Sequence, residues 1–449
     1  MTDSASPERR DLHAPAEVVR IARRLEDAGF QTWAVGGAVR DALAGHVPGD
    51  WDLTTAARPG DVRRLFKRTV PVGIEHGTVG VLGADGKMYE VTTFRRDVET
   101  DGRHAKVSFS DTVDEDLLRR DFTINAVAWH PRTHEVRDPH GGVRDLEAGV
   151  LRTVGDPAER FREDRLRVLR ALRFAGRFGL RVDDATWDAA RATAEALPDL
   201  SAERIRDELF KTLREVARPS VSLALYADCG ALRTLYPELQ ACIGVADGDA
   251  DVWTHLLRTV DEVPRHRSKL RLAGLLHDIG KPRTRTVEDG REAFPEHAEV
   301  GAAMAYGMLK RLKCSNADTD RTVHLVAQHS GLPPSDARAA DVRRWLRRVG
   351  PEHAWDLLRL RMADARARGS AGDAREAAAL RGRVRQALAA RVPLGISGLA
   401  IDGAELRRLG IPAGPLMGEI LRDLLERVTD DPALNDADTL RGLVRERIS

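Results

Sequence analysis

The sequence predicts a multidomain α+β protein in which a small mixed α/β head precedes a long all-α body. Its 449 residues suffice for about three domains of roughly 150 residues each. The β-rich runs lie within the first 150 residues, at 78–82, 89–94 and 126–130. From about Pro157 onward, helical patterns continue to the C-terminus and are interrupted at turn residues such as Gly179.

The composition is that of an ordered globular chain, because 42% of the residues are hydrophobic and 31% are charged. The 71 basic and 70 acidic residues leave a net charge of +1, which argues against a nucleic-acid partner, since such domains are usually basic. Cys229, Cys242 and Cys314 have no C-x-x-C spacing, so neither a disulfide framework nor a thiolate zinc site is expected. The first residues are polar and no apolar run reaches the ~18–20 residues of a membrane span. We therefore expect a cytoplasmic protein without a membrane partner.

The head begins with alternating helices and strands. Hydrophobic periodicity predicts, in order, a helix at 18–28, a strand at 30–35, a helix at 38–44, a strand at 51–54 and a helix at 59–66. The later segment 95–114 is long, polar and contains glycine, so we expect a mobile loop there. In the body, the Ala/Arg-rich stretch 367–390 predicts a solvated helix that joins two helical units.

Asp50, Trp51 and Asp52 form the most informative tripeptide of the head. On a strand, residues i and i+2 project from the same face, so the two carboxylates would converge while Trp51 points the other way. Two like charges held so close repel each other unless a cation lies between them, and oxygen ligands completed by water suit Mg²⁺. An exposed D-x-D turn without a metal is the alternative.

A glycine pair just upstream strengthens the metal interpretation. Gly36 and Gly37 lie where a predicted strand meets the N-terminus of the next helix, and Arg40 is close by. Backbone N–H groups at such a junction can cradle a triphosphate. A lone Gly-Gly pair is usually only a turn, but a pair followed about a dozen residues later by two aspartates favours a nucleotide site.

Six ordered motifs between residues 30 and 210 carry a resemblance to a known family. The first consists of residues 36–41 and 50–55, which read G-G-A-V-R-D and D-W-D-L-T-T. Together they resemble the signature of the tRNA nucleotidyltransferase and bacterial poly(A) polymerase family, the class II branch of the polymerase-β-like nucleotidyltransferases. The further matches are 90–95, 119–126, 138–142, 160–167 and 201–209. The resemblance implies a polymerase-β-like nucleotidyltransferase head.

The resemblance also implies roles for individual residues. Asp50 and Asp52 would bind two catalytic Mg²⁺ ions. Glu90 is the third carboxylate, which either completes the metal site or helps to deprotonate an RNA 3′-hydroxyl. The residues expected to bind the nucleotide are Gly36, Gly37, Arg40, Arg119, Arg120, Asp121, Asn125, Asp164, Arg167 and Arg170.

Asp164 and Arg167 are the expected base-selecting pair. On a helix they are i and i+3 and share a face, so an ordinary intrahelical salt bridge is the alternative. Cytosine and adenine each present an amino donor beside a ring-nitrogen acceptor, which a carboxylate and a guanidinium can address together. Guanine and uracil present the opposite pattern and would leave groups unpaired. In the family this motif is the protein template, and the resemblance extends that role to this pair.

The activity that the resemblance implies is addition of CCA to tRNA 3′ ends from CTP and ATP. Residues 73–78 resemble CCA-adding enzymes more than poly(A) polymerases, and residues 100–105 resemble the flexible loop of enzymes that add the full CCA. An A-adding tRNA nucleotidyltransferase or a poly(A) polymerase is the alternative, because most of the motifs are shared. A phosphohydrolase with a vestigial head and a non-catalytic RNA-binding module are two further classes, which the intact Asp50/Asp52 pair disfavours.

A second metal constellation lies in the body. His277 and Asp278, adjacent at a predicted helix end, can both reach one divalent metal. His255 lies one helix earlier and Asp364 about two helices later, which gives the H…HD…D arrangement of HD phosphohydrolases. The set resembles the HD domain attached to some bacterial members of the family, where it supports metal-dependent phosphatase or phosphodiesterase activity. An HD fold that only shapes an RNA-binding surface is the alternative, and the metal is not identified. Further HD positions are matched by His297 and His329.

These observations divide the chain into five segments. We expect a polar tail at 1–12, the catalytic head at 13–152, a nucleotide-selecting and RNA-binding helical neck at 153–245, the HD domain at 246–368 and a tRNA-binding helical tail at 369–449. The near-zero net charge does not exclude RNA, because six arginines lie between residues 162 and 177 while acidic residues elsewhere cancel the total. The expected partners are tRNA, CTP and ATP, and the sequence leaves the oligomeric state open.

Overall fold

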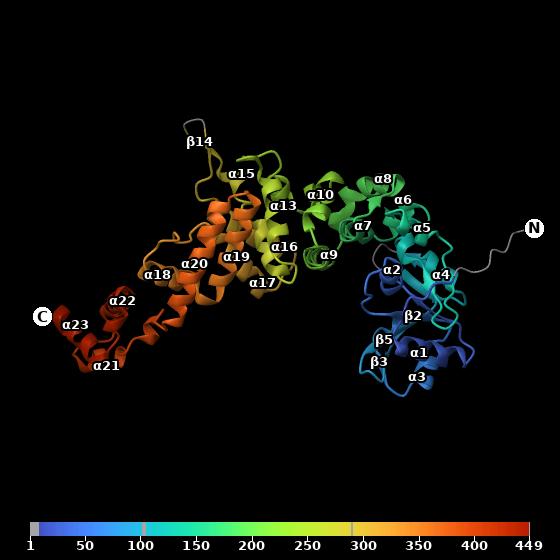
Figure 1. Cartoon of the computed structure of the whole chain (residues 1–449), viewed down its shortest axis with the longest axis horizontal. Coiled ribbons are helices and arrows are strands. Elements are labelled where there is room, and N and C mark those ends of the chain that lie inside the picture. The colour runs from blue at the N-terminus through green and yellow to red at the C-terminus, as the bar shows by residue number, and fades with distance from the viewer. Residues whose placement is uncertain (1–8, 101–104, 289–290, 449) are drawn as a thin grey trace, which may run out of the picture. The chain divides into compact units, whose positions relative to one another are not determined.

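The computed structural model describes residues 9–100, 105–288 and 291–448 (Figure 1). The chain forms two compact units. The first comprises residues 1–208 and 221–235, and the second comprises residues 209–220 and 236–449.

The first unit is built around a seven-stranded mixed sheet. Its strands are β1 (Thr32–Val35), β2 (Asp52–Thr55), β3 (Thr69–Pro71), β4 (Thr78–Leu82), β5 (Met88–Thr93), β8 (Ala128–Trp129) and β9 (Val136–Arg137). They follow the order β3-β4-β5-β2-β1-β8-β9, in which β2 and β5 run parallel and the other neighbours run antiparallel. The expected mixed α/β head is therefore confirmed.

The register of the central strands brings chain segments together at one edge. Val35 at the end of β1 is opposite Asp52 at the start of β2, so the glycine turn that follows β1 lies beside Asp52. Leu53 of β2 is opposite Val91 of the parallel strand β5. Asp52 and Glu90, each one residue earlier, are therefore level on neighbouring strands.

The helices of the head cover the sheet with amphipathic stripes. They are α1 (Ala16–Glu26), α2 (Gly37–Leu43) and α3 (Pro59–Leu65), and a short 3₁₀ turn, η1 (Ile74–His76), precedes β4. The buried cluster includes Val18, Ile21, Leu25, Leu53 and Val91. Each of these helices was predicted to within a few residues, because the apolar stripe that sets the periodicity is the face that packs on the sheet.

The prediction of a mobile loop at 95–114 is wrong. Strands β6 (Arg95–Thr100) and β7 (Ala105–Phe109) form an antiparallel two-stranded sheet, and helix α4 (Val113–Leu118) follows them. The two strands satisfy their backbone groups with each other and are not part of the main sheet, so the apolar alternation that marks a buried strand is absent from the sequence. Four residues of the stretch 100–105, matched above to a loop of full CCA-adding enzymes, lie outside the described residues.

The rest of the first unit is mainly helical. Its elements are η2 (Thr123–Asn125), α5 (Gly142–Glu147), β10 (Val150–Leu151), α6 (Pro157–Glu163), α7 (Leu166–Phe178), β11 (Arg181–Val182), α8 (Asp184–Thr193), η3 (Ala194–Asp199), α10 (Pro219–Asp228) and α11 (Ala231–Leu235), together with the first half of α9 (Ala202–Glu215). Short strands β10 and β11 pair in parallel. Phe122, Ile124, Leu151 and Phe174 form a buried cluster that joins α7 to the segment beside the sheet.

The expected single helix through Asp164 and Arg167 is also wrong. Helix α6 ends at Glu163, and Asp164 has an extended backbone with φ −152° and ψ 102°. Its carboxylate accepts a hydrogen bond from the backbone N–H of Leu166, at the start of α7. A short polar side chain that bonds nearby backbone favours such a break, so Asp164 and Arg167 do not share one helical face.

The second unit is almost entirely helical. Its longer helices are α13 (Val252–Glu262), α14 (Ser268–Leu276), α16 (His297–Arg311), α17 (Asn316–Gln328), α18 (Ala339–Val349), α19 (Pro351–Ala367), α20 (Ala371–Ala389), α22 (Pro415–Asp430) and α23 (Ala437–Ile448). Its shorter elements are α12 (Pro237–Gln240), α15 (Lys281–Thr284), α21 (Gly403–Arg408), η4 (Ile396–Gly398), η5 (Pro432–Leu434) and two hairpins, β12 (Ala246–Asp247) with β13 (Ala250–Asp251) and β14 (Thr286–Glu288) with β15 (Arg291–Ala293). The expected all-α body is confirmed. None of the helices in the described part of the chain is long and apolar enough to span a membrane.

Two apolar clusters hold the second unit together. One includes Leu270, Leu325, Leu357 and Trp345, and the other lies among α21, α22 and α23. The helix expected at 367–390 is present as α20, but it is not merely solvated, because its Leu380 belongs to the first cluster. An Ala/Arg-rich composition hides such a narrow buried stripe.

Gly280 shows how closely the second unit packs around the His277-Asp278 pair. A Cβ atom added at Gly280 would lie 2.1 Å from the carbonyl oxygen of His297 and 2.6 Å from the backbone nitrogen of Gly301. Both contacts are to backbone, which cannot move aside as a flexible side chain would. The close approach of α15 and α16 therefore requires a glycine at this position.

We predict that Gly280→Ala lowers the free energy of unfolding of the second unit by about 1–3 kcal/mol, as overpacking does in other cores. Gly307→Ala is the matched control, because Gly307 is exposed on α16 with open space around it. This control should raise stability by up to ~1 kcal/mol through helix propensity. Thermal unfolding followed by circular dichroism measures both changes. A Gly280→Ala variant as stable as the unmodified protein would contradict the packing argument.

Candidate active sites

Three carboxylates approach one another at the edge of the head sheet. Asp52 opens β2, and Glu90 is level with it on β5. Asp50 is exposed and precedes the strand, so the expectation that Asp50 and Asp52 project from one strand face is wrong. Burial, with the negative charges of Glu90 and Asp50, raises the pKa of Asp52 to about 6, against the opposing effect of Arg120. A cation bound among these oxygens would relieve that repulsion.

The glycine turn lies directly beside this carboxylate group. Gly36 has a φ of +78° and stands immediately before α2. A Cβ atom there would lie 3.2 Å from a guanidinium nitrogen of Arg120 and 3.9 Å from Oδ2 of Asp52. The positive φ and the close approach both favour glycine. The turn thus leaves room for Arg120 to reach the carboxylates.

Arg40 is buried in the wall of the head cavity. Its guanidinium donates to the Oδ1 atoms of Asp41 and Asn125, the latter at 2.6 Å, and lies 4.3 Å from the ring centroid of Phe178. Burial lowers its pKa, and the neighbouring Asp41 opposes that change. In this structure Arg40 therefore positions Asn125.

Asp121 and Arg170 extend the same network. Arg170 donates to Oδ2 of Asp121 at 2.7 Å, while Oδ1 accepts hydrogen bonds from the side chain of Asn125 and the backbone of Phe122. Burial alone would raise the pKa of Asp121, but the charge of Arg170 and these hydrogen bonds outweigh it and lower the pKa. Asp121 is therefore ionised and fixed in orientation.

The expected base-selecting pair is held by two different partners. Arg204 of α9 donates to both carboxylate oxygens of Asp164, at 2.8 and 3.0 Å. Arg167 donates to Glu163 at 2.5 Å and to the backbone carbonyl of Arg160. The intrahelical salt bridge between Asp164 and Arg167 does not form, and each side chain is instead oriented from outside.

A cavity of about 570 Å³ in the first unit collects these side chains. The predicted residues that line it are Gly36, Gly37, Arg40, Asp52, Arg119, Arg120, Asp121, Asn125, Asp164, Arg167 and Arg170. Asp50 and Glu90 are not among the lining residues, although both act on the pKa of Asp52. The further arginines of the lining are Arg95, Arg173, Arg177 and Arg204. Nine arginines and three aspartates make the cavity strongly positive, which suits a triphosphate.

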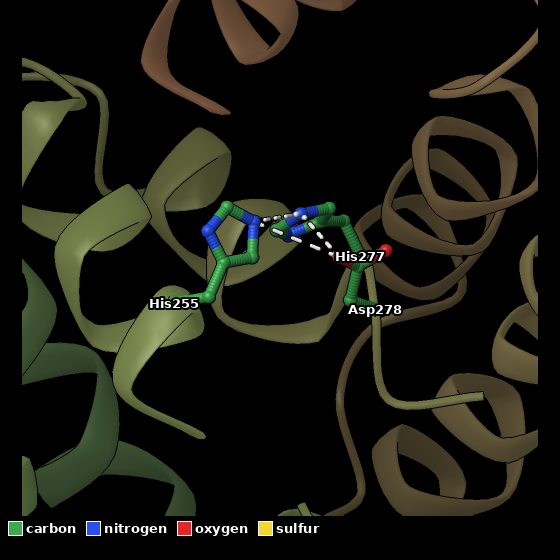
Figure 2. A group of neighbouring side chains, drawn as sticks. All are labelled: His255, His277 and Asp278. Carbon is green, nitrogen blue, oxygen red and sulfur yellow. Dashed lines mark hydrogen bonds and ion pairs between the residues drawn. The ribbon is translucent and has the colours of Figure 1, made fainter. Parts of the chain in front are cut away.

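The second unit brings the HD residues together. The Nε2 atom of His255 lies 3.2 Å from Nε2 of His277, 3.6 Å from Oδ2 of Asp278 and 3.0 Å from Oδ1 of Asp364. His277 lies 3.3 Å from the same oxygen of Asp278 and 3.9 Å from that of Asp364. Figure 2 shows His255 of α13 converging with the adjacent residues His277 and Asp278, which follow α14. All four residues are buried.

A second group uses the other oxygen of Asp278. Its Oδ1 atom lies 3.4 Å from Nε2 of His297 and 3.3 Å from Nε2 of His329, and these two nitrogens are 3.3 Å apart. A divalent ion about 2.0–2.2 Å from each ligand holds neighbouring ligand atoms about 3.0–3.6 Å apart. The separations in both groups fit this range, apart from His277 to Asp364. Asp278 is therefore placed to bridge two ions.

The hydrogen bonds behind the imidazoles explain their orientation. The Nδ1 atoms of His277, His297 and His329 lie 2.7–2.9 Å from the backbone carbonyl oxygens of Gly274, Phe294 and Val326, respectively. A carbonyl only accepts, so each Nδ1 carries a proton, and in the neutral ring Nε2 is left with a lone pair that can bind a metal. Burial lowers the pKa of His297, which favours the neutral ring. The lone pairs of His297 and His329 then face each other, an arrangement that a cation between them would stabilise.

Sequence reasoning missed three residues at this centre and one in the head. Lys281 follows the H-D pair in the quoted sequence, and its spacing of i+3 from Asp278 could have drawn attention to it. Asp247 and Arg368 come from distant segments, and no local pattern marks them. Arg204 was inside a matched stretch, but nothing in the sequence pairs it with Asp164.

Three segments of the chain match models of known families. Residues 32–152 match the poly A polymerase head domain, residues 179–243 match a probable RNA and SrmB-binding site of polymerase A, and residues 250–368 match the HD domain. The chain therefore combines a segment similar to the poly A polymerase head domain with a segment similar to the HD domain. The proteins that it resembles are CCA-adding enzymes.

The curated relatives cover only part of the chain. The CCA-adding enzyme of Enterococcus faecalis is 39% identical over 55% of this chain and 63% of the relative, and that of Bacillus pumilus is 46% identical over 44% and 49%. The chain thus spans less than two thirds of the length of these relatives. The structure of the Bacillus stearothermophilus CCA-adding enzyme in complex with CTP is 28% identical, with a TM-score of 0.75, over 96% of this chain and 98% of that chain. The Thermotoga maritima enzyme complexed with tRNA shares the fold, at 20% identity and a TM-score of 0.58.

The two ligand groups of the second unit predict two bound divalent ions per chain. We expect a parent variant with Asp50→Asn and Asp52→Asn, which removes carboxylates of the head, to bind two Mn²⁺ ions in equilibrium dialysis. Adding His329→Ala should leave one, because it removes a ligand of the second group only. His324→Ala is the control, since His324 lies on the same helix and bonds the carbonyl oxygen of Val349 instead. Equal stoichiometry for His329→Ala and the parent would rule out the second group.

Proposed function

We propose that this protein adds CCA to the 3′ ends of tRNA from CTP and ATP, without a nucleic-acid template. The observation that carries the proposal is that Asp52, with Asp50 and Glu90 close to it, faces a cavity lined by arginines. The similarity to CCA-adding enzymes, including one solved with CTP, supports it. Since tRNA and nucleoside triphosphates meet in the cytoplasm, we also propose a cytoplasmic location.

We propose that Asp50, Asp52 and Glu90 hold Mg²⁺, which prefers oxygen ligands. Bound there, Mg²⁺ would lower the pKa of the RNA 3′-hydroxyl and neutralise charge on the departing pyrophosphate. The 3′-oxygen forms a bond to the α-phosphorus while the bond to pyrophosphate breaks. Arg119 and Arg120 face the same cavity and would bind the triphosphate oxygens.

The other predicted residues would position the nucleotide. Asp121 is ionised and held by Arg170, so its fixed carboxylate can orient a ribose hydroxyl together with Asn125. Gly36 and Gly37 would let the triphosphate approach the backbone beside Asp52. Arg40, which is already bonded to Asn125, would act by holding that side chain in place.

For base selection, we propose that Asp164 accepts from the amino group of cytosine or adenine while Arg167 donates to the ring nitrogen. Both side chains line the cavity, and each is already oriented by a fixed partner. Arg204 would be a positioning residue, because it holds both oxygens of Asp164. A carboxylate held in this way leaves guanine and uracil with unpaired groups.

The first test is nucleotide incorporation into tRNA that ends at the discriminator base, at the first C or at CC. We expect two CMP additions and then one AMP addition, with a stop after three nucleotides, and a loss of at least about a hundredfold in Asp52→Asn. Asp27→Asn, at an exposed aspartate of the head, should have no effect. Incorporation of ATP alone onto CC ends would indicate an A-adding enzyme, and continued ATP addition would indicate a poly(A) polymerase. Incorporation of neither CTP nor ATP would refute the proposal.

The second test concerns Arg204. Arg204→Ala should release Asp164 and raise misincorporation of UTP and GTP relative to CTP and ATP by about tenfold, which is the scale of one lost charge-assisted hydrogen bond. Arg206→Ala is the matched control on the same helix, since Arg206 pairs with Asp207. Kinetics with each separate triphosphate measure the ratio. An unchanged ratio at reduced overall rate would show that Arg204 does not act through base selection.

We propose a second activity for the HD domain, a metal-dependent phosphohydrolase that acts on RNA ends such as a 2′,3′-cyclic phosphate. The observation that favours it is the pair of ligand groups that share Asp278, with imidazole lone pairs directed into each group. His255, His277, Asp278 and Asp364 would hold one divalent ion, and His297 and His329 would hold a second with Asp278. An ion bound there would activate water for attack on phosphorus.

A further inference from the structure

Arg368 is the side chain most closely involved with the first ligand group of the HD centre. It follows the last turn of α19, and its guanidinium makes three contacts to the group. Nε lies 3.0 Å from Oδ1 of Asp364, and Nη2 lies 3.1 Å from Nε2 of His255 and 3.2 Å from Oδ2 of Asp278. These are the same ligand atoms that the proposed metal site uses.

Asp247 holds this guanidinium and a second cation together. Its Oδ2 atom accepts from Nη1 of Arg368 at 3.0 Å and from Nζ of Lys281 at 2.9 Å. Lys281 in turn lies 2.7 Å from Oδ2 of Asp278 and is buried. Asp247 comes from the short hairpin of β12 and β13, which places it outside both ligand groups. Two cations are therefore fixed beside the centre by a carboxylate that is not a ligand.

The cavity at the centre opens onto these cations. It measures about 290 Å³ and is lined by His277, Asp278, Lys281, Asp364 and Arg368, whereas His255 is not among its lining residues. A molecule that enters the cavity therefore meets Arg368 beside the ligand oxygens. The volume suits a terminal phosphate with its sugar better than a folded RNA segment.

We propose that Arg368, held by Asp247 beside Lys281, is the residue that binds the substrate's phosphate group at the HD centre. The proposal rests on the phosphohydrolase function proposed above. The single lone pair of Nε2 in His255 cannot serve a guanidinium N–H and a metal ion at once, whereas each oxygen of Asp278 and Asp364 has a second lone pair. Arg368 must therefore give up its contact to His255 when that residue binds metal, and its contact to Asp247 keeps it at the cavity.

The charges of the site favour a phosphate in that state. Asp247, Asp278, Asp364 and Glu376 carry four negative charges, which exceed by one the positive charges of Lys281, Arg361 and Arg368. With two divalent ions held, the same side chains surround a site with three net positive charges. A dianionic phosphate then neutralises most of the excess, and the planar guanidinium can bind two of its oxygens at once.

The experiment measures binding of Mn²⁺ and then of inorganic phosphate, each by calorimetry, in the full chain that carries Asp50→Asn and Asp52→Asn. With Arg368→Ala, we expect Mn²⁺ affinity at the first group to stay equal or rise up to about tenfold, because a competing cation is gone. Phosphate affinity of the Mn²⁺-loaded protein should fall at least about tenfold. The phosphate affinity of Arg368→Lys should lie between those of the parent and Arg368→Ala, since lysine keeps the charge but not the planar guanidinium.

Arg366→Ala is the matched control, because Arg366 lies on the same helix and pairs with Glu262. It should leave both affinities unchanged. Retained Mn²⁺ binding shows that Arg368→Ala is folded. A phosphate affinity within twofold of the parent would then overturn the proposed role of Arg368 but not the phosphohydrolase centre. A parent protein whose Mn²⁺ binding is unaffected by His277→Ala would overturn the phosphohydrolase centre and this inference together.

Discussion

Both candidate sites hold groups that repel one another, either carboxylates of like charge or imidazole nitrogens whose lone pairs face each other. In the head, burial and, to a smaller extent, the negative charges of Glu90 and Asp50 raise the pKa of Asp52 to about 6. In the HD domain, two imidazole nitrogens face each other at 3.3 Å. Groups that repel stay in place only when the surrounding structure fixes them. The rest of each unit can be understood as the means of doing so.

The two units meet this constraint in different ways. The head relies on backbone register, since parallel pairing of β2 with β5 sets Asp52 level with Glu90 whatever their charges. The HD domain relies on hydrogen bonds behind the ligands, where backbone carbonyls fix the imidazoles of His277, His297 and His329. Sheet register is rigid over a long range, while a helical scaffold must orient each side chain separately.

Local periodicity and motif spacing could predict the elements but not all of the pairings. The central strands and first helices of the head were predicted because their apolar faces are buried, whereas β6 and β7 were predicted as a loop. The same-face argument for Asp50 and Asp52 failed because β2 begins only at Asp52, and a short apolar pattern does not fix where a strand begins. The partners Arg204 for Asp164 and Arg368 for the HD ligands come from distant segments. Such contacts exist only once the chain is folded, so spacing in the sequence carries no trace of them.

The net charge of the whole chain likewise says little about the charge at one site. A total of +1 argued against RNA, yet one cavity of the head is lined by nine arginines and three aspartates. Coulomb attraction between exposed groups fades within about 8–10 Å at physiological salt, so a polyanion responds to the groups in its own cavity. The type of cation also matters, because 63 of the 71 basic residues are arginine. Arg40 lies over Phe178 while donating to Asp41 and Asn125, and a lysine at that position could not present a planar face and several fixed donors at once.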